Sequence, residues 1–282
     1  MKISIVGLGL IGGSIALALR KSGFATSITG VDNNQEHALK AISLRLVDQI
    51  DTLQNAILNT DIIILATPVH TLHQLLPKIL DDINQNQIVI EVGSTKKNVI
   101  DSIAQHPKRN QFVASHPMAG TEFSGPEAAL EDLFVNKVCV ICDPEKSNTA
   151  MLETVKNMFQ QYLKMRLVYM KSEDHDVHTA YISHISHICS FALASTVLAK
   201  EKDEESIFNL ASTGFESTVR LAKSNPETWI PIFEQNQDNI IDVLDEYINT
   251  LLKYKGLMMA GGYDKLKEFL YQANDIKRIL NK

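Results

Sequence analysis

Three glycines near the start of the 282-residue chain restrict its fold more than any other feature of the sequence. Gly7, Gly9 and Gly12 follow a short apolar segment and open a segment of helical composition. Their spacing suits a strand that turns tightly into a helix, whose first backbone N–H groups can bind a pyrophosphate. The glycines therefore predict a dinucleotide-binding domain at the beginning of the chain.

The residue that ends the second expected strand supports this interpretation. Asp32 lies about 20 residues beyond the glycines, where a carboxylate accepts hydrogen bonds from ribose hydroxyls. The same carboxylate would repel the 2′-phosphate of NADP, and neither Asn33 nor Asn34 brings a cation to offset it. NAD is the expected cofactor, although a helix N-cap or a turn is an alternative role for Asp32. We assign to the cofactor Gly7, Gly9, Leu10, Ile11, Gly12, Asp32, Thr67 and Pro68.

Strands and helices alternate through the first 170 residues. Several of the strands are continuous apolar runs, which are typical of strands that are buried on both faces of a sheet. We expect strands at residues 2–6, 27–31, 61–67, 87–92, 112–114, 138–141 and 165–170, and helices at 12–21, 34–43, 69–80 and 96–103. This alternation predicts an α/β fold with a Rossmann-type doubly wound, mostly parallel sheet.

From about residue 172 the chain becomes helical. The spacing of apolar residues predicts one long apolar helix at 175–199 and further helices at 206–211, 217–223, 226–254 and 265–280. The long helix needs more covering than one small domain provides, so an all-helical dimerisation domain is the simplest hypothesis. The expected domains are residues 1–170, which bind NAD, and residues 171–282, which bind the substrate and form a homodimer.

Charge and composition narrow the class of partner. The formal net charge is −6, so no general field draws the chain to nucleic acid or to an anionic membrane. The apolar run before Arg20 resembles a signal peptide, but its glycines fit a nucleotide-binding turn and interrupt any membrane span. We therefore expect a cytoplasmic protein that binds a small molecule and contacts neither nucleic acid nor membrane.

Two groups of side chains suggest a metal or redox site. Cys139 and Cys142 form a C-x-x-C pair, but residues three apart on a strand point to opposite faces, and no second pair follows at zinc spacing. We interpret them as two buried strand cysteines. Four histidines of the long helical segment suggest a metal-binding face: His175, His178, His184 and His187. No further ligand accompanies them, so we expect no metal.

One histidine and one arginine are candidates for chemistry on a ligand. His116 follows a strand of the sheet, at the edge where nucleotide-binding sheets place functional loops. A hydrogen-bonded surface residue is the alternative for this histidine. Arg220 could bind a ligand carboxylate with two hydrogen bonds, or it could form an ordinary surface salt bridge.

Four segments of the sequence together resemble the prephenate/arogenate dehydrogenase family. They are GLGLIGGS, HPMAGTEFSG, SHISHICSFAL and STGFESTVRLAKSNPETW, and they occur in the order found in that family. The resemblance runs from the first strand to about Trp229. It implies a Rossmann domain, a helical dimerisation domain and an active site in the cleft between them. It also implies NAD-dependent oxidative decarboxylation of prephenate to 4-hydroxyphenylpyruvate, a step of tyrosine biosynthesis.

The resemblance assigns roles to individual residues. His116 is similar to the catalytic base that accepts the ring hydroxyl proton, and Ser94 to the serine that hydrogen-bonds substrate or nicotinamide. The residues that the resemblance places at the substrate are Thr121, His187, Arg220 and Gly214. Among these, the arginine would bind a substrate carboxylate. The segment before this arginine is less rich in glycine here than in the family.

Other activities remain open on the sequence. L-Arogenate carries an amino group where prephenate carries a keto group, and it is an alternative substrate. A β-hydroxyacid or imine-reducing dehydrogenase would be expected to use a helix lysine or no base. The presence of His116 and Arg220 in one pattern disagrees with that expectation. A non-catalytic NADH sensor would need neither residue, and a DNA-binding sensor would show a basic patch. Because the chain ends at Lys282, we expect neither the ACT domain nor the chorismate mutase domain of some relatives.

Overall fold

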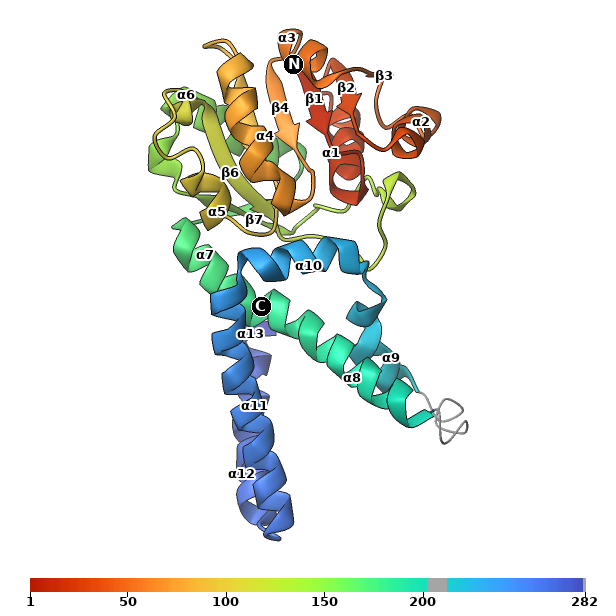
Figure 1. The fold of residues 1–282 in the computed structure, drawn as a ribbon, viewed down its shortest axis with the longest axis vertical. Coiled ribbons are helices and arrows are strands. Elements are labelled where there is room, and N and C mark those ends of the chain that lie inside the picture. Colours follow the sequence, from red (N-terminus) through yellow and green to blue (C-terminus); the bar gives the residue numbers. More distant parts are fainter. Residues whose placement is uncertain (202–211, 281–282) are drawn as a thin grey trace. The chain divides into compact units, whose positions relative to one another are not determined.

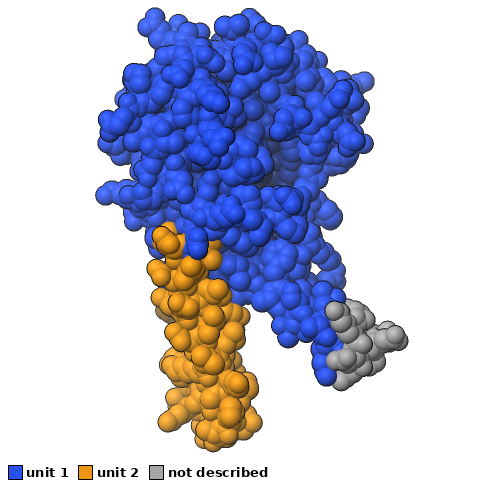
Figure 2. Space-filling view, in the orientation of Figure 1, with its two compact units in different colours: residues 1–237 blue, residues 238–282 orange. Residues whose placement is uncertain are grey.

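The computed structural model describes residues 1–201 and 212–280. The expected helix at residues 206–211 lies outside the described residues. The chain divides into two compact units, Met1–Gln237 and Asp238–Lys282, which are blue and orange in Figure 2. The first unit therefore contains the sheet together with the helices that follow it up to residue 237. The functional boundary expected after residue 170 stays a prediction.

An eight-stranded sheet within residues 2–170 forms the centre of the first unit (Figure 1). Its strands are β1 (Lys2–Val6), β2 (Ser27–Val31), β3 (Gln49–Ile50), β4 (Ile62–Leu65), β5 (Ile88–Glu91), β6 (Phe112–Pro117), β7 (Val138–Cys142) and β8 (Arg166–Met170). Their order across the sheet is β3-β2-β1-β4-β5-β6-β7-β8. The first six strands are parallel, whereas β7 is antiparallel to β6 and β8 is parallel to β7. The chain returns from β3 to β4 beside β1, which confirms the doubly wound, mostly parallel fold.

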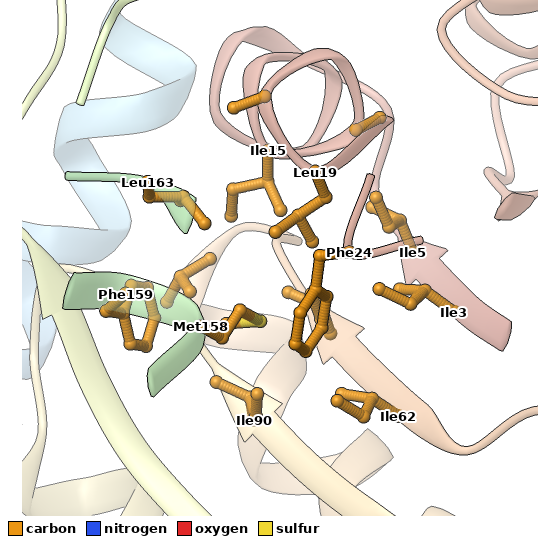
Figure 3. Close-up of a cluster of buried hydrophobic side chains, with 14 of the residues drawn as sticks. Ile3, Ile5, Ile15, Leu19, Phe24, Ile62, Ile90, Met158, Phe159 and Leu163 are labelled. Atoms are coloured by element: carbon orange, nitrogen blue, oxygen red, sulfur yellow. The ribbon is translucent and has the colours of Figure 1, made fainter. Parts of the chain in front are cut away.

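Helices cover both faces of this sheet. They are α1 (Leu10–Lys21), α2 (Gln35–Ser43), α3 (Leu53–Leu58), α4 (Val69–Asp82), α5 (Lys97–Asp101) and α6 (Thr149–Asn157). Along β4, Ile62 and Ile64 join one buried cluster, while Ile63 and Leu65 join the other. Figure 3 shows part of the first cluster, where α1 packs its apolar side chains on the sheet. The continuous apolar run of β4 is explained by this burial on both faces.

The C-x-x-C pair lies on β7. Cys139 belongs to one buried cluster and Cys142 to the other, so the two thiols point to opposite faces of the sheet, as predicted. Burial raises the pKa of both thiols far above the usual value. Both therefore stay protonated and fill space in the core, which confirms their interpretation as two buried strand cysteines.

The helices that follow the sheet differ in their bounds from those that the apolar patterns predict. They are α7 (Ser172–Thr179), α8 (Ile185–Glu201), α9 (Thr213–Val219), α10 (Pro226–Gln235), α11 (Gln237–Met259), α12 (Tyr263–Ala273) and α13 (Lys277–Leu280). A π-helical turn, η5 (Ala180–His184), joins α7 to α8. The expected helix at 226–254 is interrupted at Asn236, whose side chain donates to the carbonyl oxygen of Asp176 at 2.7 Å. A contact distant in sequence thus fixes this break.

The helical stretch Ser172–Lys200 contains an 18-residue window with a mean hydropathy of 1.4, so it could cross a membrane by length and composition alone. A core helix of a soluble protein passes the same test. Only 22% of this window is buried, and its exposed side chains include Ile182, Leu193 and Leu198. The helix therefore presents apolar surface that the described residues leave open, in agreement with the expectation that it needs further covering.

One ion pair lies entirely inside the sheet domain. Glu91, the last residue of β5, and Lys96, in the loop that follows, are both 0% exposed and bind each other. The Lys96 ammonium also donates to the carbonyl oxygen of Ser115 in β6 at 2.7 Å. The backbone N–H of Gly93 donates to Glu91 Oε2 at 2.8 Å. These bonds fix the loop that carries Ser94 against two strands.

Lys96→Met should leave the Glu91 carboxyl buried without its cation. Removal of one partner of a buried pair costs about 3–5 kcal/mol of unfolding free energy. Because burial raises the pKa of Glu91, the folded variant tolerates this carboxyl best when it is protonated, and the loss should grow as pH rises. Urea denaturation on both sides of neutrality measures this loss.

The double variant Glu91→Leu/Lys96→Met is the matched control, because it removes both charges. It should recover part of the stability that the single variant loses. A single variant that loses less than about 1 kcal/mol above neutral pH, the value of an exposed pair, would contradict the assigned role.

Candidate active site

A cleft of about 1530 Å³ opens at the carboxyl ends of the parallel strands. Residues that directly follow β1, β2, β4 and β5 line it, as expected for a nucleotide-binding sheet. The predicted cofactor residues in its lining are Gly7, Gly9, Leu10, Ile11, Asp32, Thr67 and Pro68. Gly12 is absent from this lining. The fold thus brings the predicted cofactor residues together, and their contacts with a cofactor stay a prediction.

The glycine loop needs its glycines for two different reasons. Gly7 has a φ of +95°, and a Cβ there would lie 2.6 Å from the carbonyl oxygen of Ala66. A Cβ on Gly12 would lie 2.0 Å from the carbonyl oxygen of Gly7, so α1 can approach β1 only without a side chain. A Cβ on Gly9 would meet nothing within 4 Å, which leaves open space beside the first N–H groups of α1. This space suits a pyrophosphate.

Asp32 lies in the wall of the cleft at the end of β2. Its Oδ2 accepts from the backbone N–H of Leu8 at 2.8 Å, and its Oδ1 accepts from that of Asn34 at 2.9 Å. The N-cap of α2 is Asn34, whose side chain accepts from Glu36 and His37. The N-cap alternative for Asp32 is therefore wrong, whereas the turn bond coexists with its place beside the glycine loop.

Two residues of the predicted substrate and catalytic set line the same cleft. Ser94 follows β5 and Thr121 lies in the loop after β6. The Thr121 hydroxyl oxygen accepts from the backbone N–H of Phe123 at 3.2 Å, which shapes this loop. The lining does not include His116, His187, Arg220 and Gly214.

His116 is buried near the end of β6, with 9% of its surface exposed. Because β6 neighbours β5 in the sheet, His116 lies beside the loop that carries Ser94. Its Nδ1 is 2.8 Å from Nε2 of His175. Burial, followed by the electrostatic effects of His175 and Lys96, holds the pKa of His116 well below its usual value. The ring is therefore neutral near pH 7, as a general base must be.

His187 packs against an aromatic wall of the cleft. Its ring stacks on Trp229, which lines the cleft, with ring centroids 3.4 Å apart and planes at 26°. Its Nδ1 lies 3.1 Å from the carbonyl oxygen of Ser183, which can only accept, so Nδ1 carries the proton. Burial lowers the pKa of His187 and favours this neutral form. The predicted contact of His187 with substrate is consistent with this position.

Arg220 forms an ion pair with a residue of the cleft. Its Nη1 lies 2.8 Å from Oε2 of Glu122, and Glu122 lines the cleft directly after Thr121. The Arg220 side chain is 49% exposed, so water can compete with the pair and the pair is easily rearranged. A carboxylate that enters the cleft can therefore compete with Glu122 for this arginine.

Gly214 lies on α9, where a Cβ would meet only Ser212 Oγ, at 3.9 Å. Within the described residues, the backbone gives no reason for a glycine at this position. Sequence patterns assign no role to Glu122 or Trp229, although both occur in the segments that carry the resemblance. The adjacency of Glu122 to Thr121 is the signal that points to this carboxylate.

Three of the four helix histidines serve as hydrogen-bonding or packing groups. His175 binds His116, and His184 lies 3.1 Å from the Asn236 amide, while His187 stacks on Trp229. Among residues 1–201 and 212–280, no group of three His, Cys, Asp or Glu side chains is placed to hold a metal ion.

Two family models match successive parts of the chain. Residues 15–169 match the model described as the nucleotide-binding domain of prephenate dehydrogenase, and residues 171–272 match that of its dimerization domain. The chain belongs to the prephenate dehydrogenase family. The prephenate dehydrogenase of Bacillus subtilis is 34% identical over 278 residues, which cover 98% of this chain and 75% of the relative.

Solved structures of the family share the whole fold. The prephenate dehydrogenase from A. aeolicus, in complex with hydroxyphenyl propionate and NAD+, superposes with a TM-score of 0.89 at 31% identity and covers 100% of this chain and 99% of its own. The Synechocystis arogenate dehydrogenase superposes with a TM-score of 0.77 at 32% identity, covering 97% and 98%. These likenesses confirm the predicted family and the predicted Rossmann-type fold followed by a helical domain.

Asp32→Ala should relax the preference for NAD over NADP by about tenfold or more, because it removes the charge that repels a 2′-phosphate. It also removes the acceptor for Leu8 N–H, which should weaken the binding of both cofactors. Asp32→Asn keeps an acceptor and removes only the charge, so it separates the two effects. The ratio of kcat/KM for the two cofactors is the measurement. A ratio that stays constant in both variants would make Asp32 purely structural.

Proposed function

We propose that the chain catalyses the NAD-dependent oxidative decarboxylation of prephenate to 4-hydroxyphenylpyruvate, in tyrosine biosynthesis. The observation that carries this proposal is a buried, neutral histidine, His116, beside a loop of the nucleotide cleft in a chain of this family. The structure from A. aeolicus with NAD+ and hydroxyphenyl propionate supports the choice of cofactor and of substrate class.

The cleft fits NAD at three points. The open space beside Gly9 and the N–H groups of α1 suit the pyrophosphate, and the Asp32 carboxylate suits the ribose hydroxyls. Bound NAD would supply the hydride acceptor. The carboxylate also disfavours a 2′-phosphate, which supports NAD over NADP.

The residues of the chain supply the base and the anchors. Prephenate carries a hydroxyl on ring carbon C4 and a carboxylate on C1. His116 takes the hydroxyl proton as C4 loses its hydride, and C4 becomes a carbonyl carbon. The bond between C1 and its carboxylate then breaks, its electron pair enters the ring, CO2 leaves, and the ring oxygen takes back a proton. The aromatic product makes the sequence effectively irreversible.

Arg220 would bind a carboxylate of the substrate. A hydrogen bond between charged partners contributes about 1.5–3 kcal/mol. A hydrogen bond from its own backbone N–H, and then Arg220, lower the pKa of Glu122. Glu122 is therefore charged near neutral pH, and the substrate carboxylate must compete with it for the guanidinium. Ser94 and Thr121 would complete the polar contacts in the cleft.

L-Arogenate is the second candidate substrate. The likeness to the Synechocystis arogenate dehydrogenase, at 32% identity over nearly the whole chain, favours this alternative. A β-hydroxyacid dehydrogenase and a non-catalytic NADH sensor are less well supported, because both family models that match belong to prephenate dehydrogenase.

A homodimer in the cytoplasm is the proposed working form. Residues 171–272 match a dimerization domain. In the first unit α8 exposes Leu193 and Leu198, and in the second unit α11 exposes Ile248 and Leu252. A second copy of the chain would cover such apolar surfaces.

NADH formation by the purified protein with NAD and either prephenate or L-arogenate tests the proposed function. Turnover with prephenate is the expected result. His116→Asn should lower this turnover by about 10²- to 10⁴-fold, because the base is lost, while NAD binding stays unchanged. The matched control is His73→Asn, at an exposed histidine of α4, which should keep wild-type turnover.

Near-normal turnover by the His116→Asn variant would reject this histidine as the base. No turnover of either substrate by wild-type protein that binds NAD would reject the proposed function itself.

Arg220→Ala should raise the KM for prephenate by about tenfold or more and change kcat much less, because it removes binding that substrate and transition state share. The KM for NAD should stay constant. Lys223→Ala is the matched control, at an exposed cation that pairs with Glu216 at 3.7 Å, and it should leave both constants unchanged. If Arg220→Ala leaves the KM for prephenate at its wild-type value, the arginine lies outside the substrate site.

A further inference from the structure

Three buried side chains form a continuous line of hydrogen bonds that ends at His116. His116 Nδ1 lies 2.8 Å from His175 Nε2, and His175 Nδ1 lies 2.8 Å from Asp176 Oδ1. His175 is 1% exposed and Asp176 is 3% exposed. The line runs from β6 to α7, so it joins the sheet to the first helix after it.

The direction of each hydrogen bond follows from the groups around Asp176. Its Oδ1 accepts from the backbone N–H of Lys96 and its Oδ2 from that of Lys97, both at 2.9 Å. The carboxylate is thus an acceptor, and His175 must donate to it from Nδ1. Burial lowers the pKa of His175, so its ring is neutral and its Nε2 is an acceptor. His116 therefore donates from Nδ1, which leaves its own Nε2 without a proton.

We propose that His175 and Asp176 are positioning residues that hold His116 in the tautomer with its proton on Nδ1 and its basic lone pair on Nε2. This inference deepens the proposed function and rests on it. In the reaction, the hydroxyl O–H bond breaks and a new N–H bond forms at His116 Nε2. The positive charge that develops on the ring strengthens the hydrogen bond from Nδ1 to His175.

The same carboxylate also ties the base to the cleft. Lys96 and Lys97, whose N–H groups bind Asp176, follow Ser94 by two and three residues in the loop after β5. Asn236, the residue between α10 and α11, donates from its side chain to the carbonyl oxygen of Asp176 and so also holds this segment. Asp176 therefore sets the position of the His175 ring relative to the loop that lines the cleft.

The other groups that face His116 act against its protonated form. Lys96 faces it from the loop after β5 and His184 from η5, and both lower its pKa, as burial and then His175 do to a larger extent. From β7 the residue paired with His116 is the apolar Val140, which carries no charge. The acceptor nitrogen of His175 determines which nitrogen of the neutral His116 ring carries the proton.

Nitrogen NMR of histidine-labelled protein tests the tautomer directly and does not depend on turnover. In the wild type, His116 should show a protonated Nδ1 and an unprotonated Nε2 at neutral pH. His175→Phe removes the acceptor, and His116 should then populate the tautomer with its proton on Nε2. His178→Phe is the matched control, since it changes an exposed histidine three residues further along α7 and should leave the His116 signals unchanged.

Kinetics with prephenate and NAD give a second test. His175→Phe should lower kcat by about 10- to 100-fold, as expected when a base loses its preferred tautomer, with both KM values within about threefold of wild type. His175→Gln keeps an oxygen acceptor and should recover part of kcat, whereas a purely structural role predicts no such recovery.

Each outcome decides a stated point. An unchanged His116 tautomer in His175→Phe, or no recovery of kcat in His175→Gln, overturns the positioning role. If His175→Phe fails to fold, His175→Gln and Asp176→Asn carry the same test, and a wild-type tautomer in Asp176→Asn overturns the role of the carboxylate. If wild-type protein turns over neither substrate, the proposed function fails, while the NMR result still decides whether His175 sets the tautomer.

Discussion

The arrangement of the site depends on one buried ion pair, between Glu91 and Lys96 beneath the loop after β5. Two charges without water are tolerated there because each has further hydrogen bonds, to Gly93 N–H and to the carbonyl oxygen of Ser115. The pair fixes a loop of only a few residues, and this loop has two functions. Its first part lines the cleft through Ser94, and its last N–H groups hold the carboxylate that orients α7. One short backbone segment thus contributes both to the lining of the cleft and to the support of the catalytic base.

Most of the fold follows from local patterns. The glycine spacing predicts the turn from β1 to α1, since only a residue without a side chain fits at Gly12, and the apolar run of β4 predicts a strand that is buried on both faces. Other features depend on contacts that local patterns do not contain. β3 has only two residues, too few to show an alternation. The break at Asn236 lies in an apolar pattern that continues through it, and the Asn236 side chain bonds there to Asp176 and His184, which are distant in sequence.

The candidate site likewise combines residues that the sequence predicts with contacts that it does not predict. Motif spacing predicts the glycine loop and Asp32, the family resemblance adds Ser94 and Thr121, and these residues meet at the cleft. The spacing of the helix histidines also suggests a metal face, because residues three or four apart on a helix share a side. The structure uses His175 differently, as the partner of His116 from a distant strand. A periodic pattern in the sequence cannot predict this hydrogen bond, because the two histidines are 59 residues apart. The sequence likewise does not predict the ion pair between Glu122 and Arg220.

The burial of the site histidines gives the folded and unfolded chains different numbers of bound protons. Burial lowers the pKa of His116, His175, His184 and His187, and that of His184 falls to about 4. As pH falls below the usual imidazole pKa of about 6.5, the unfolded chain binds protons that the folded chain does not bind, so acid favours unfolding. This stability is complete above that pH and is lost progressively toward the folded pKa values. The dry surroundings that keep the base ready to accept a proton therefore also limit how acidic a solution the fold withstands.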